Sequence, residues 1–580
     1  MPKDRKSFLT IFYPEENISF RSRSDREVSV ENIIDHILST SRIPQNSINF
    51  ALLEHSTTLI NGSQNSMNEI WAYSPPGNLE LIKIKRRSYR WVKILLIVLI
   101  VSLIFLLGCT WFYQNHFLHH YGAVFDAGSA HTSLSIYKWH HKYNIRSKSE
   151  LPFLINEEIT QTMGCESSSS SGVSSYIKDP RNVRSYITES PCFNRSKTLV
   201  PKGSHIFFGA TAGMRILKAT KPRIAKAIMS NITKALSEFK NVNATIISGI
   251  DEGIYGWITV NYLSHSFSNE TLGALDWGGA SSQITFELKE GLDKYEDHIR
   301  PINLINKNFS LFVRSDLCYG KYEALKRYLS MLVYSYYKRF GHIPEEIASP
   351  CHKAGRIYSN AELINTKMFT RPCTDIRDGM FLKMVKKVNF TVKGSGNFRK
   401  CQHLIISEAF NFERCTSIFK GHCINPKEIP LTLGRTYIAF STYFYYLQSL
   451  NLLPSIPQPQ EYLNTIKDIC EKDNSIITTS PNSCFEGLFL HHLLTLGYHF
   501  DDWSKGVRFL RKIKNNEVGW TLGYIIHRST VERDFFLLSF PLFAISMICL
   551  FLLLIIVIIY YLYSQCCSYS ARTYRPLIAL

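Results

Sequence analysis

The segment YGAVFDAGSAHTSL (residues 121–134) decides the fold class of this chain. Its apolar run, GAVF, leads directly into Asp126, which is followed by small residues and several hydroxyl side chains. Small residues let a phosphate approach backbone N–H groups closely, and hydroxyls add further hydrogen-bond donors. One loop of this kind is weak evidence by itself, because many glycine-containing turns only join two strands.

The segment GALDWGGASSQITF (residues 273–286) repeats the arrangement, with Asp276 in the place of Asp126. Two more segments share the composition of small and hydroxyl residues: IFFGATAGMRIL (206–217) and IISGIDEGIYGWITVNYL (246–263). A repeated strand–Asp–x–Gly loop indicates two related lobes that face each other across a cleft. Strands and helices alternate elsewhere, which favours an α/β fold.

The carboxylates in these segments suit phosphate chemistry. Asp126 and Asp276 could hold, mostly through water, a divalent ion that also binds phosphate oxygens. Glu252 follows an apolar strand and is a candidate general base for water, with Asp251 as its competitor. Adjacent strand residues point to opposite faces, so only one of these two should face the cleft. Gln283 could orient the water or contact the hydration shell of the ion.

Two apolar runs, residues 94–113 and 535–561, are each long enough to cross a membrane as a helix. Six basic residues lie just before the first run and none lies just after it, in QNHFLHH. The positive-inside rule therefore places residues 1–93 in the cytosol and the middle section outside the cell or in a secretory lumen. The tail, residues 562–580, returns to the cytosol.

Glycosylation and cysteine patterns agree with this topology. The middle section contains six N-x-Ser/Thr acceptors: Asn194, Asn231, Asn243, Asn269, Asn308 and Asn389. Ten of the 14 cysteines also lie there, an even number that indicates five disulfides in an oxidising compartment. The net charge of +19 comes with no nucleic-acid motif, so we expect no nucleic-acid partner.

Residues 1–90 form a separate unit. SFLTIFY (7–13) and NISFRSRS (17–24) predict two short strands, and residues 29–41 predict a helix that begins near Ser29. Later strands are expected near 47–55 and 79–87. This ββαββ order resembles a ubiquitin-like β-grasp of the Ras-association kind, and the alternative is an unclassified small α+β domain.

The four loop segments resemble the conserved regions of the ecto-nucleoside triphosphate diphosphohydrolase (apyrase) family. These are membrane-anchored proteins of the actin, Hsp70 and hexokinase (RNase H-like) fold. Further matching segments are LCYGKYEALKRY (317–328), YIAFSTYFYYL (437–447), SCFEGLFLHHLLTLGYHF (483–500) and GWTLGYII (519–526). The resemblance covers roughly residues 115–565 and leaves residues 1–90 outside.

The resemblance implies hydrolysis of nucleoside tri- and diphosphates to monophosphates with Ca²⁺ or Mg²⁺. Glu252 would be the base and Gln283 its helper, and Asp126 and Asp276 would hold the hydrated ion. The residues implied for binding phosphate or nucleotide are Ser129, Ala130, His131, Thr132, Thr211, Ala212, Gly213, Gly279, Ala280, Ser281, Ser282 and Tyr445. The implied disulfides are Cys165–Cys192, Cys318–Cys373, Cys351–Cys401, Cys415–Cys423 and Cys470–Cys484.

The expected organisation follows from these observations. The cytosolic unit spans 1–90 and the first membrane helix 94–113. Lobe I of the ectodomain spans 116–248 and is completed by about 515–534, and lobe II spans 249–514. The second membrane helix spans 535–561.

Two departures from the family pattern concern the loops, and one concerns the neighbour of the base. Ala130 stands where Ser is usual, Trp277 where an aliphatic residue is usual, and Asp251 where a second Glu is common. Loss of one neutral hydrogen bond at Ala130 costs about 1 kcal/mol, so we expect altered kinetics rather than inactivity. Trp277 is expected to pack inward and to carry no function.

Three functions remain open at this point. The first is an ectoenzyme of the cell membrane, and the second is a nucleoside diphosphatase of a Golgi or lysosomal membrane. The third is a receptor-like protein with weak catalysis, whose cytosolic unit binds a small GTPase. Relatives with two membrane spans commonly associate through them, so a homo-oligomer is also expected.

Overall fold

The computed structural model describes most of residues 119–531, the segments 8–12 and 17–21, and single residues within 97–108 and 548–560. Within 119–531 the longer undescribed segments are 141–158, 167–171, 411–422 and 473–479. The chain forms two compact units, Met1–Ile100 and Val101–Leu580.

In the first unit, β1 (Phe8–Phe12) and β2 (Asn17–Arg21) form an antiparallel pair, with Ile11 opposite Ile18. This confirms the two predicted N-terminal strands. The expected helix and the later strands of residues 1–90 lie outside the described residues.

Lobe I is built on a five-stranded sheet of order β5-β4-β3-β6-β7. Its central strand, β3, pairs antiparallel with β4 and parallel with β6. Ala123 and Val124 of this strand have no exposed surface. Burial on both faces explains the continuous apolar run of the sequence. The strands are β3 (His119–Ala127), β4 (Thr132–His140), β5 (Thr160–Glu166), β6 (His205–Ala210) and β7 (Asn241–Ile246), and the helices are α3 (Val183–Thr188), α4 (Pro191–Leu199), α5 (Ala212–Thr220) and α6 (Pro222–Ala235).

Lobe II is built on a six-stranded sheet of order β10-β11-β9-β8-β15-β16. The strands are β8 (Gly273–Trp277), β9 (Ser281–Glu287), β10 (Ile299–Leu304), β11 (Lys307–Leu317), β15 (Tyr437–Ser441) and β16 (Val507–Phe509). Like β3, the strand β8 pairs antiparallel with the strand that follows it, β9, and parallel with a more distant strand, β15. The two Asp-containing segments therefore have the same topology in both lobes.

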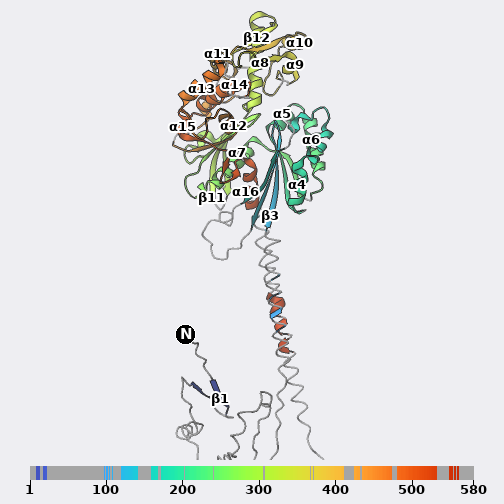
Figure 1. The fold of residues 1–580 in the computed structure, drawn as a ribbon, viewed down its shortest axis with the longest axis vertical. Coiled ribbons are helices and arrows are strands. Elements are labelled where there is room, and N and C mark those ends of the chain that lie inside the picture. The colour runs from blue at the N-terminus through green and yellow to red at the C-terminus, as the bar shows by residue number, and fades with distance from the viewer. Residues whose placement is uncertain are drawn as a thin grey trace, which may run out of the picture. The chain divides into compact units, whose positions relative to one another are not determined.

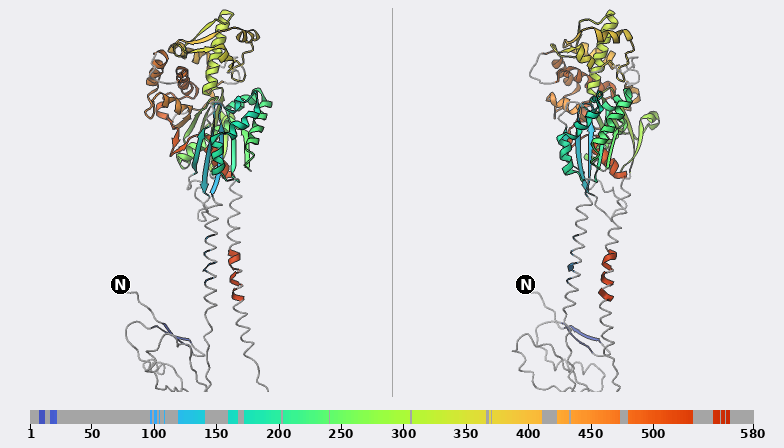
Figure 2. Two further views of the ribbon diagram at one scale, coloured as in Figure 1. Left: turned by 45° about the vertical axis from the view of Figure 1, so that its right-hand side comes forward. Right: turned by 90° about the vertical axis from the view of Figure 1, so that its right-hand side faces the viewer.

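A second, largely helical part of lobe II carries a small sheet of order β12-β14-β13. Figures 1 and 2 show these elements grouped at one end of the unit, away from β3. The helices are α8 (Lys321–Phe340), α9 (Asn360–Asn365), α10 (Gly379–Lys387), α11 (Phe398–His403), α12 (Thr442–Ser449), α13 (Pro459–Glu471), α14 (Ser483–His492) and α15 (Trp503–Gly506). The strands are β12 (Glu346–Ser349), β13 (Ile357–Ser359) and β14 (Thr391–Gly394), and a short hairpin is formed by β17 (Lys512–Ile513) and β18 (Asn516–Glu517).

Helices α7 (Gly249–Leu263) and α16 (Trp520–Val531) lie between the two large sheets (Figure 1). The Gly523 N–H of α16 donates to Thr259 Oγ1 of α7 at 2.8 Å. A Cβ at Gly523 would lie 1.9 Å from the Tyr255 carbonyl oxygen, so the close approach of these helices needs glycine there. One apolar cluster joins residues of both sheets through these helices and fixes the lobes around a shared core.

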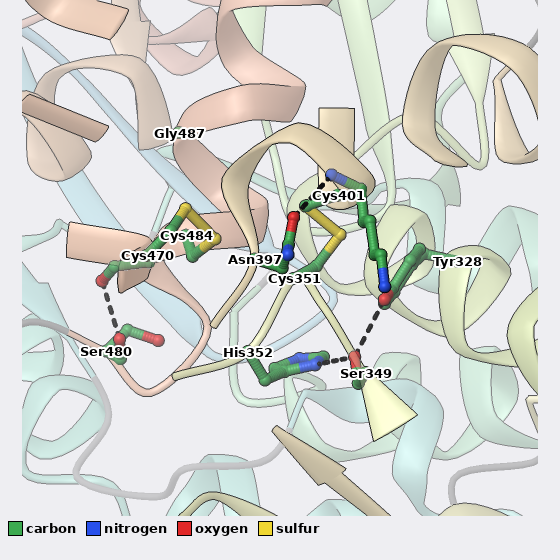
Figure 3. Close-up of a disulfide and its surroundings, with 12 residues drawn as sticks. Tyr328, Ser349, Cys351, His352, Asn397, Cys401, Cys470, Ser480, Cys484 and Gly487 are labelled. Carbon is green, nitrogen blue, oxygen red and sulfur yellow. Dashed lines mark hydrogen bonds between the residues drawn. A yellow bond between two sulfur atoms is a disulfide. The ribbon is translucent and has the colours of Figure 1, made fainter. Parts of the chain in front are cut away.

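Four of the five predicted disulfides are confirmed: Cys165–Cys192, Cys318–Cys373, Cys351–Cys401 and Cys470–Cys484. Cys423 is also disulfide-bonded, and its predicted partner, Cys415, lies outside the described residues. Figure 3 shows two of these bridges, Cys351–Cys401 and Cys470–Cys484, in the helical part of lobe II. Close to them, buried His352 accepts or donates a hydrogen bond with Ser349 at 2.7 Å, and Ser349 in turn bonds Tyr328.

Within the described residues, no helix has the length and apolar character needed to cross a membrane. Most of the two predicted spans, residues 94–113 and 535–561, lies outside the described part of the chain.

Candidate active site

A cavity of about 650 Å³ lies between the two lobes, and both Asp-containing loops line it. The loops approach each other closely, since a Cβ at Gly279 would lie 2.1 Å from Ser129 Oγ. Gly279 belongs to the β8–β9 loop and Ser129 to the β3–β4 loop. A cavity of this size is typical of small-molecule sites. The predicted cleft between two related lobes therefore exists, with small residues of both loops close together in it.

Asp126 and Asp276 occupy equivalent places in this cavity. Asp126 lies opposite Ser133 in the β3–β4 ladder, and Asp276 lies opposite Gln283 in the β8–β9 ladder. Each carboxylate has a buried oxygen, Oδ1, for which the described part of the chain offers no hydrogen-bond partner. Burial and the negative charge of Glu252 raise the pKa of Asp126 to about 7 and that of Asp276 to about 8. Such carboxylates require a cation to remain ionised together.

Glu252 lies in the first turn of α7 and not at the end of a strand, which corrects the sequence-based expectation. The strand β7 ends at Ile246, and Ser248 then caps the helix by accepting a hydrogen bond from the Asp251 N–H at 3.0 Å. Asp251 accepts the Ser248 hydroxyl at 2.7 Å and is part of this cap. Glu252 is 8% exposed and lines the cavity, whereas Asp251 does not line it.

Two side chains hold the carboxylate of Glu252. Arg215 Nη1 lies 2.8 Å from Glu252 Oε2, and Gln283 Nε2 donates to the same oxygen at 2.9 Å. Both contacts use Oε2, which leaves Oε1 as the oxygen that can accept a proton from water. Arg215 also donates to Ser281 Oγ at 2.9 Å and so ties α5 of lobe I to β9 of lobe II.

Sequence reasoning missed Arg215, although it is the last residue of the GATAGMR motif. Its position in the motif was the available signal. Its partner Glu252 lies on another element, and a contact of this kind is not visible in one sequence.

Eight residues predicted to bind phosphate line the cavity: Ser129, Ala130, His131, Thr211, Ala212, Gly279, Ala280 and Ser281. Thr132, Gly213, Ser282 and Gln283 do not line it. The hydroxyl of Ser282 donates to the Asp276 carbonyl oxygen and accepts from Tyr498. Successive strand residues point to opposite faces, so Ser281 faces the cavity and Ser282 faces the core.

The wider part of the cavity contains aromatic and charged side chains. Tyr445 lines it with 47% of its surface exposed, and Tyr322 with 46%. The Arg511 guanidinium lies 5.8 Å from the centre of the Tyr445 ring, and Arg511 is ion-paired with Glu517 at 3.0 Å. A half-exposed tyrosine that carries a cation near its ring suits the stacking of a planar base.

The departure at Trp277 has a structural explanation. Trp277 has no exposed surface, and its indole N–H donates to the Tyr319 carbonyl oxygen at 3.1 Å. Its ring packs against Tyr443 and Phe489, with centroid distances of 5.4 and 5.9 Å. Trp277 thus points into the core of lobe II, as the sequence predicted.

This geometry is that of the two-lobed α/β nucleotide-hydrolase class, because Glu252 and the two loops that follow Asp126 and Asp276 line one cavity between the lobes. Comparison with protein families identifies the family. Residues 113–534 match the GDA1/CD39 (nucleoside phosphatase) family, and the chain belongs to that family.

Similar proteins agree with this assignment. The ectonucleoside triphosphate diphosphohydrolase 1 of Bos taurus is 31% identical over 441 residues, which cover 70% of this chain and 80% of the bovine protein. Ectonucleoside triphosphate diphosphohydrolase 8 of Gallus gallus is 31% identical over 442 residues, covering 70% and 82%. A crystal structure of nucleoside triphosphate hydrolases from Neospora caninum shares the fold, with a TM-score of 0.50 and 13% identity over 71% of this chain and 92% of that one.

Proposed function

We propose that the protein removes the terminal phosphate from nucleoside tri- and diphosphates, down to the monophosphate, in a reaction that depends on Ca²⁺ or Mg²⁺. The observation that carries this proposal is the carboxylate of Glu252, fixed through Oε2 by Arg215 and Gln283 beside both phosphate loops. The names of the similar bovine and chicken proteins support the substrate class.

In this proposal Glu252 acts as the general base. Its Oε1 accepts a proton from a water molecule that attacks the terminal phosphate. The Gln283 amide nitrogen donates to Glu252, Ser281 and Ser315, so Gln283 acts in this proposal by holding the carboxylate of Glu252 in place. No covalent nucleophile is needed for this in-line attack.

The phosphate chain would be bound by the two loops. Small residues at 128–130 and 278–280 bring backbone N–H groups to the cavity, and the hydroxyls of Ser129 and Ser281 add donors. These donors are already positioned by the strands, so they can stabilise charge that develops on phosphate oxygens in the transition state.

Asp126 and Asp276 fit a hydrated divalent cation. Their unpartnered buried oxygens and raised pKa values show an excess of negative charge that such a cation would relieve. Two carboxylates leave most of the coordination shell to water and phosphate oxygens. When bound, the ion supplies charge neutralisation and phosphate alignment. Tyr445 would stack on the nucleobase.

We further propose that residues 94–113 and 535–561 are membrane spans, and that the ectodomain lies outside the cell, with both termini in the cytosol. An internal Golgi or lysosomal membrane is the alternative location. Support comes from the predicted glycosylation sites, since five acceptors are exposed: Asn194, Asn243, Asn269, Asn308 and Asn389. Asn231 is half-buried and donates to the Ala227 carbonyl oxygen at 2.9 Å, so we expect less modification there. The roles of residues 1–90, a small GTPase partner and a homo-oligomer remain predictions.

The test is phosphate release by the full-length protein in membranes or mild detergent. ATP, ADP and UDP are each supplied with Ca²⁺, with Mg²⁺ or with EDTA, and the products are separated. We expect metal-dependent conversion to monophosphates and loss of activity in EDTA. Absence of metal-dependent release from every nucleotide would contradict the proposal. Glycosidase treatment of intact cells and of permeabilised cells tests the topology separately.

A further inference from the structure

A sixth carboxylate of the cavity, Glu486, has no role in the proposed reaction. The other five are Asp126, Glu166, Glu252, Asp276 and Glu517. Glu486 lies in the first turn of α14, two residues after the disulfide-bonded Cys484. The residue lines the cavity and is 1% exposed. A buried charge at a ligand cavity needs partners, because burial without them costs free energy.

The partners of Glu486 satisfy only one of its oxygens. Lys321 Nζ lies 3.2 Å from Oε1, and the Ser480 hydroxyl donates to the same oxygen at 3.3 Å. Oε2 is buried and has no hydrogen-bond partner among the described residues. Burial raises the pKa of Glu486, and the charge of Lys321 opposes this effect. The carboxylate therefore retains capacity to accept a hydrogen bond from a ligand.

The position of Lys321 shows how close Glu486 lies to the loop proposed to bind phosphate. Lys321 begins α8, and its backbone N–H donates to the Gly278 carbonyl oxygen at 3.0 Å. The next residue, Tyr322, donates in the same way to Gly279 at 2.8 Å. Glu486 is thus separated from the β8–β9 phosphate loop by one lysine side chain.

The chemistry of a carboxylate excludes some contacts and favours others. Its negative charge repels phosphate, so the polyphosphate end of a substrate should not contact Glu486 directly. A carboxylate only accepts hydrogen bonds, and the donors of a nucleotide are the N–H groups of its base and the O–H groups of its ribose. The nucleoside is therefore the part of the substrate that matches this group.

We propose that Glu486, held by Lys321, is a specificity-determining residue that accepts a hydrogen bond from an N–H or O–H donor of the substrate's nucleoside. This deepens the proposed function and rests on it. It predicts that the enzyme distinguishes nucleotides from inorganic polyphosphates, and distinguishes nucleosides by the donors they present.

The substitution Glu486→Gln in the full-length protein tests the proposal. Lys321 attracts the carbonyl oxygen of the new amide, which leaves its NH₂ group in the place of Oε2. An acceptor is thereby exchanged for a donor with little change in shape. Because a hydrogen bond to a charged group is lost, kcat/KM for ATP should fall about 10-fold or more. The interaction with inorganic tripolyphosphate, measured as substrate or as competitive inhibitor, should change less than about 2-fold.

Glu323→Gln is the matched control. Glu323 lies on α8 and is ion-paired with Lys326 at 2.6 Å, but it does not line the cavity. This variant should leave both measurements unchanged. Glu486→Asp, which keeps the charge and shortens the side chain, provides a second test if Glu486→Gln folds poorly, and it should reduce the ATP-to-tripolyphosphate ratio in the same direction.

Substrate analogues identify the donor. ATP is compared with purine riboside triphosphate, which lacks a base N–H donor, and with 2′-deoxy and 3′-deoxy ATP. For the analogue that lacks the donor bound by Glu486, wild type and Glu486→Gln should have the same kcat/KM. If the ATP-to-tripolyphosphate ratio is unchanged in both variants, the specificity proposal is wrong although hydrolysis stands. If the wild type hydrolyses no nucleotide, the proposed function itself fails.

Discussion

The β3–β4 loop of lobe I and the β8–β9 loop of lobe II have the same plan but differ in their surroundings. Each Asp is the last residue but one of the first strand and lies opposite a polar residue of the next, which is Ser133 in lobe I and Gln283 in lobe II. In lobe I the loop is open, and His131 is exposed. In lobe II the strands on both sides of the loop are buried.

This difference assigns the two loops different tasks. In lobe II, Gln283 donates a hydrogen bond to Glu252, and Trp277 is buried in the core next to Asp276. The residue of lobe I that corresponds to Trp277 is Ala127. The lobe I copy has no comparable link to Glu252 and presents Ser129 across the cavity. In the proposed reaction, a repeated motif would therefore place a carboxylate for the cation on each side of the cavity, while only the lobe II copy supports Glu252.

Among changes that compare the two loops, the largest effect should come from exchanging the residues that differ. Gln283→Ser gives lobe II the residue of lobe I, removes the hydrogen bond to Glu252 and leaves the proposed base held by Arg215 alone. We expect kcat to fall about 100-fold or more, the range found for acid–base groups. Ser133→Ala, the matched change in lobe I, should alter kcat only a few-fold. Equal effects of the two substitutions would contradict the division of tasks.

A smaller effect is expected on stability at Trp277. Trp277→Phe removes the N–H bond to Tyr319 and leaves part of the ring's volume empty, so the free energy of unfolding should fall by about 1–3 kcal/mol. Denaturant unfolding measures this loss. Because Trp277 points into the core, kcat should stay within a few-fold of wild type. A large loss of kcat with unchanged stability would show a direct role in catalysis.

The next effect concerns the pH dependence of stability without metal. The folded pKa of Asp276, about 8, lies above its ordinary value of 3.8. Protonation of Asp276 therefore stabilises the folded state. This stabilisation is complete below pH 4 and is lost as the pH rises towards 8. The Asp276→Asn variant has no carboxyl group to ionise at this position, so it does not lose this stabilisation. In EDTA the Tm of the variant minus the Tm of the wild type should therefore increase between pH 5 and 8.5.

Asp375→Asn serves as the control for that comparison. Arg377 and Arg371 lower the pKa of Asp375 to about 2, so its charge does not change above pH 5. The Tm difference between this variant and wild type should stay constant over the same range. A constant difference for Asp276→Asn as well would show that its pKa is not raised in the folded protein.

The smallest effect is expected at Ala130 in the open loop. Ala130→Ser adds one hydroxyl at the cavity, and one neutral hydrogen bond contributes about 1 kcal/mol. We expect kcat/KM for ATP or ADP to change by up to about 5-fold, with stability unchanged. Steady-state kinetics on both nucleotides will detect this, and a complete loss of activity would show that the loop tolerates no larger side chain.

The sequence predicted features that depend on local pattern. The two Asp loops, their place in a cleft and the inward packing of Trp277 follow from motifs and alternation. The buried side chain of Ser282 also follows from alternation, next to Ser281, which lines the cavity. Glu252 was placed after a strand because the cap at Ser248 was not recognised as a helix start.

Contacts between distant segments could not be predicted in this way. Arg215 meets Glu252 only after α5 of lobe I and α7 have been brought together by the packing of the lobes, and Lys321 meets Glu486 across 165 residues of chain. One sequence contains no signal for such pairs beyond the presence of opposite charges. These are also the contacts that distinguish the held base and the proposed nucleoside subsite from ordinary surface ion pairs.

The most direct test of the central claim compares Glu252→Gln with Asp251→Asn in the full-length protein. Both variants change one acidic side chain in the same helical turn to its amide. The measurement is metal-dependent phosphate release from ATP. The account predicts that Glu252→Gln loses at least about 1,000-fold in kcat, while Asp251→Asn, which changes only the helix cap, stays within about 10-fold of wild type. Retained activity in Glu252→Gln, or a greater loss in Asp251→Asn, would contradict the assignment of Glu252 as the base.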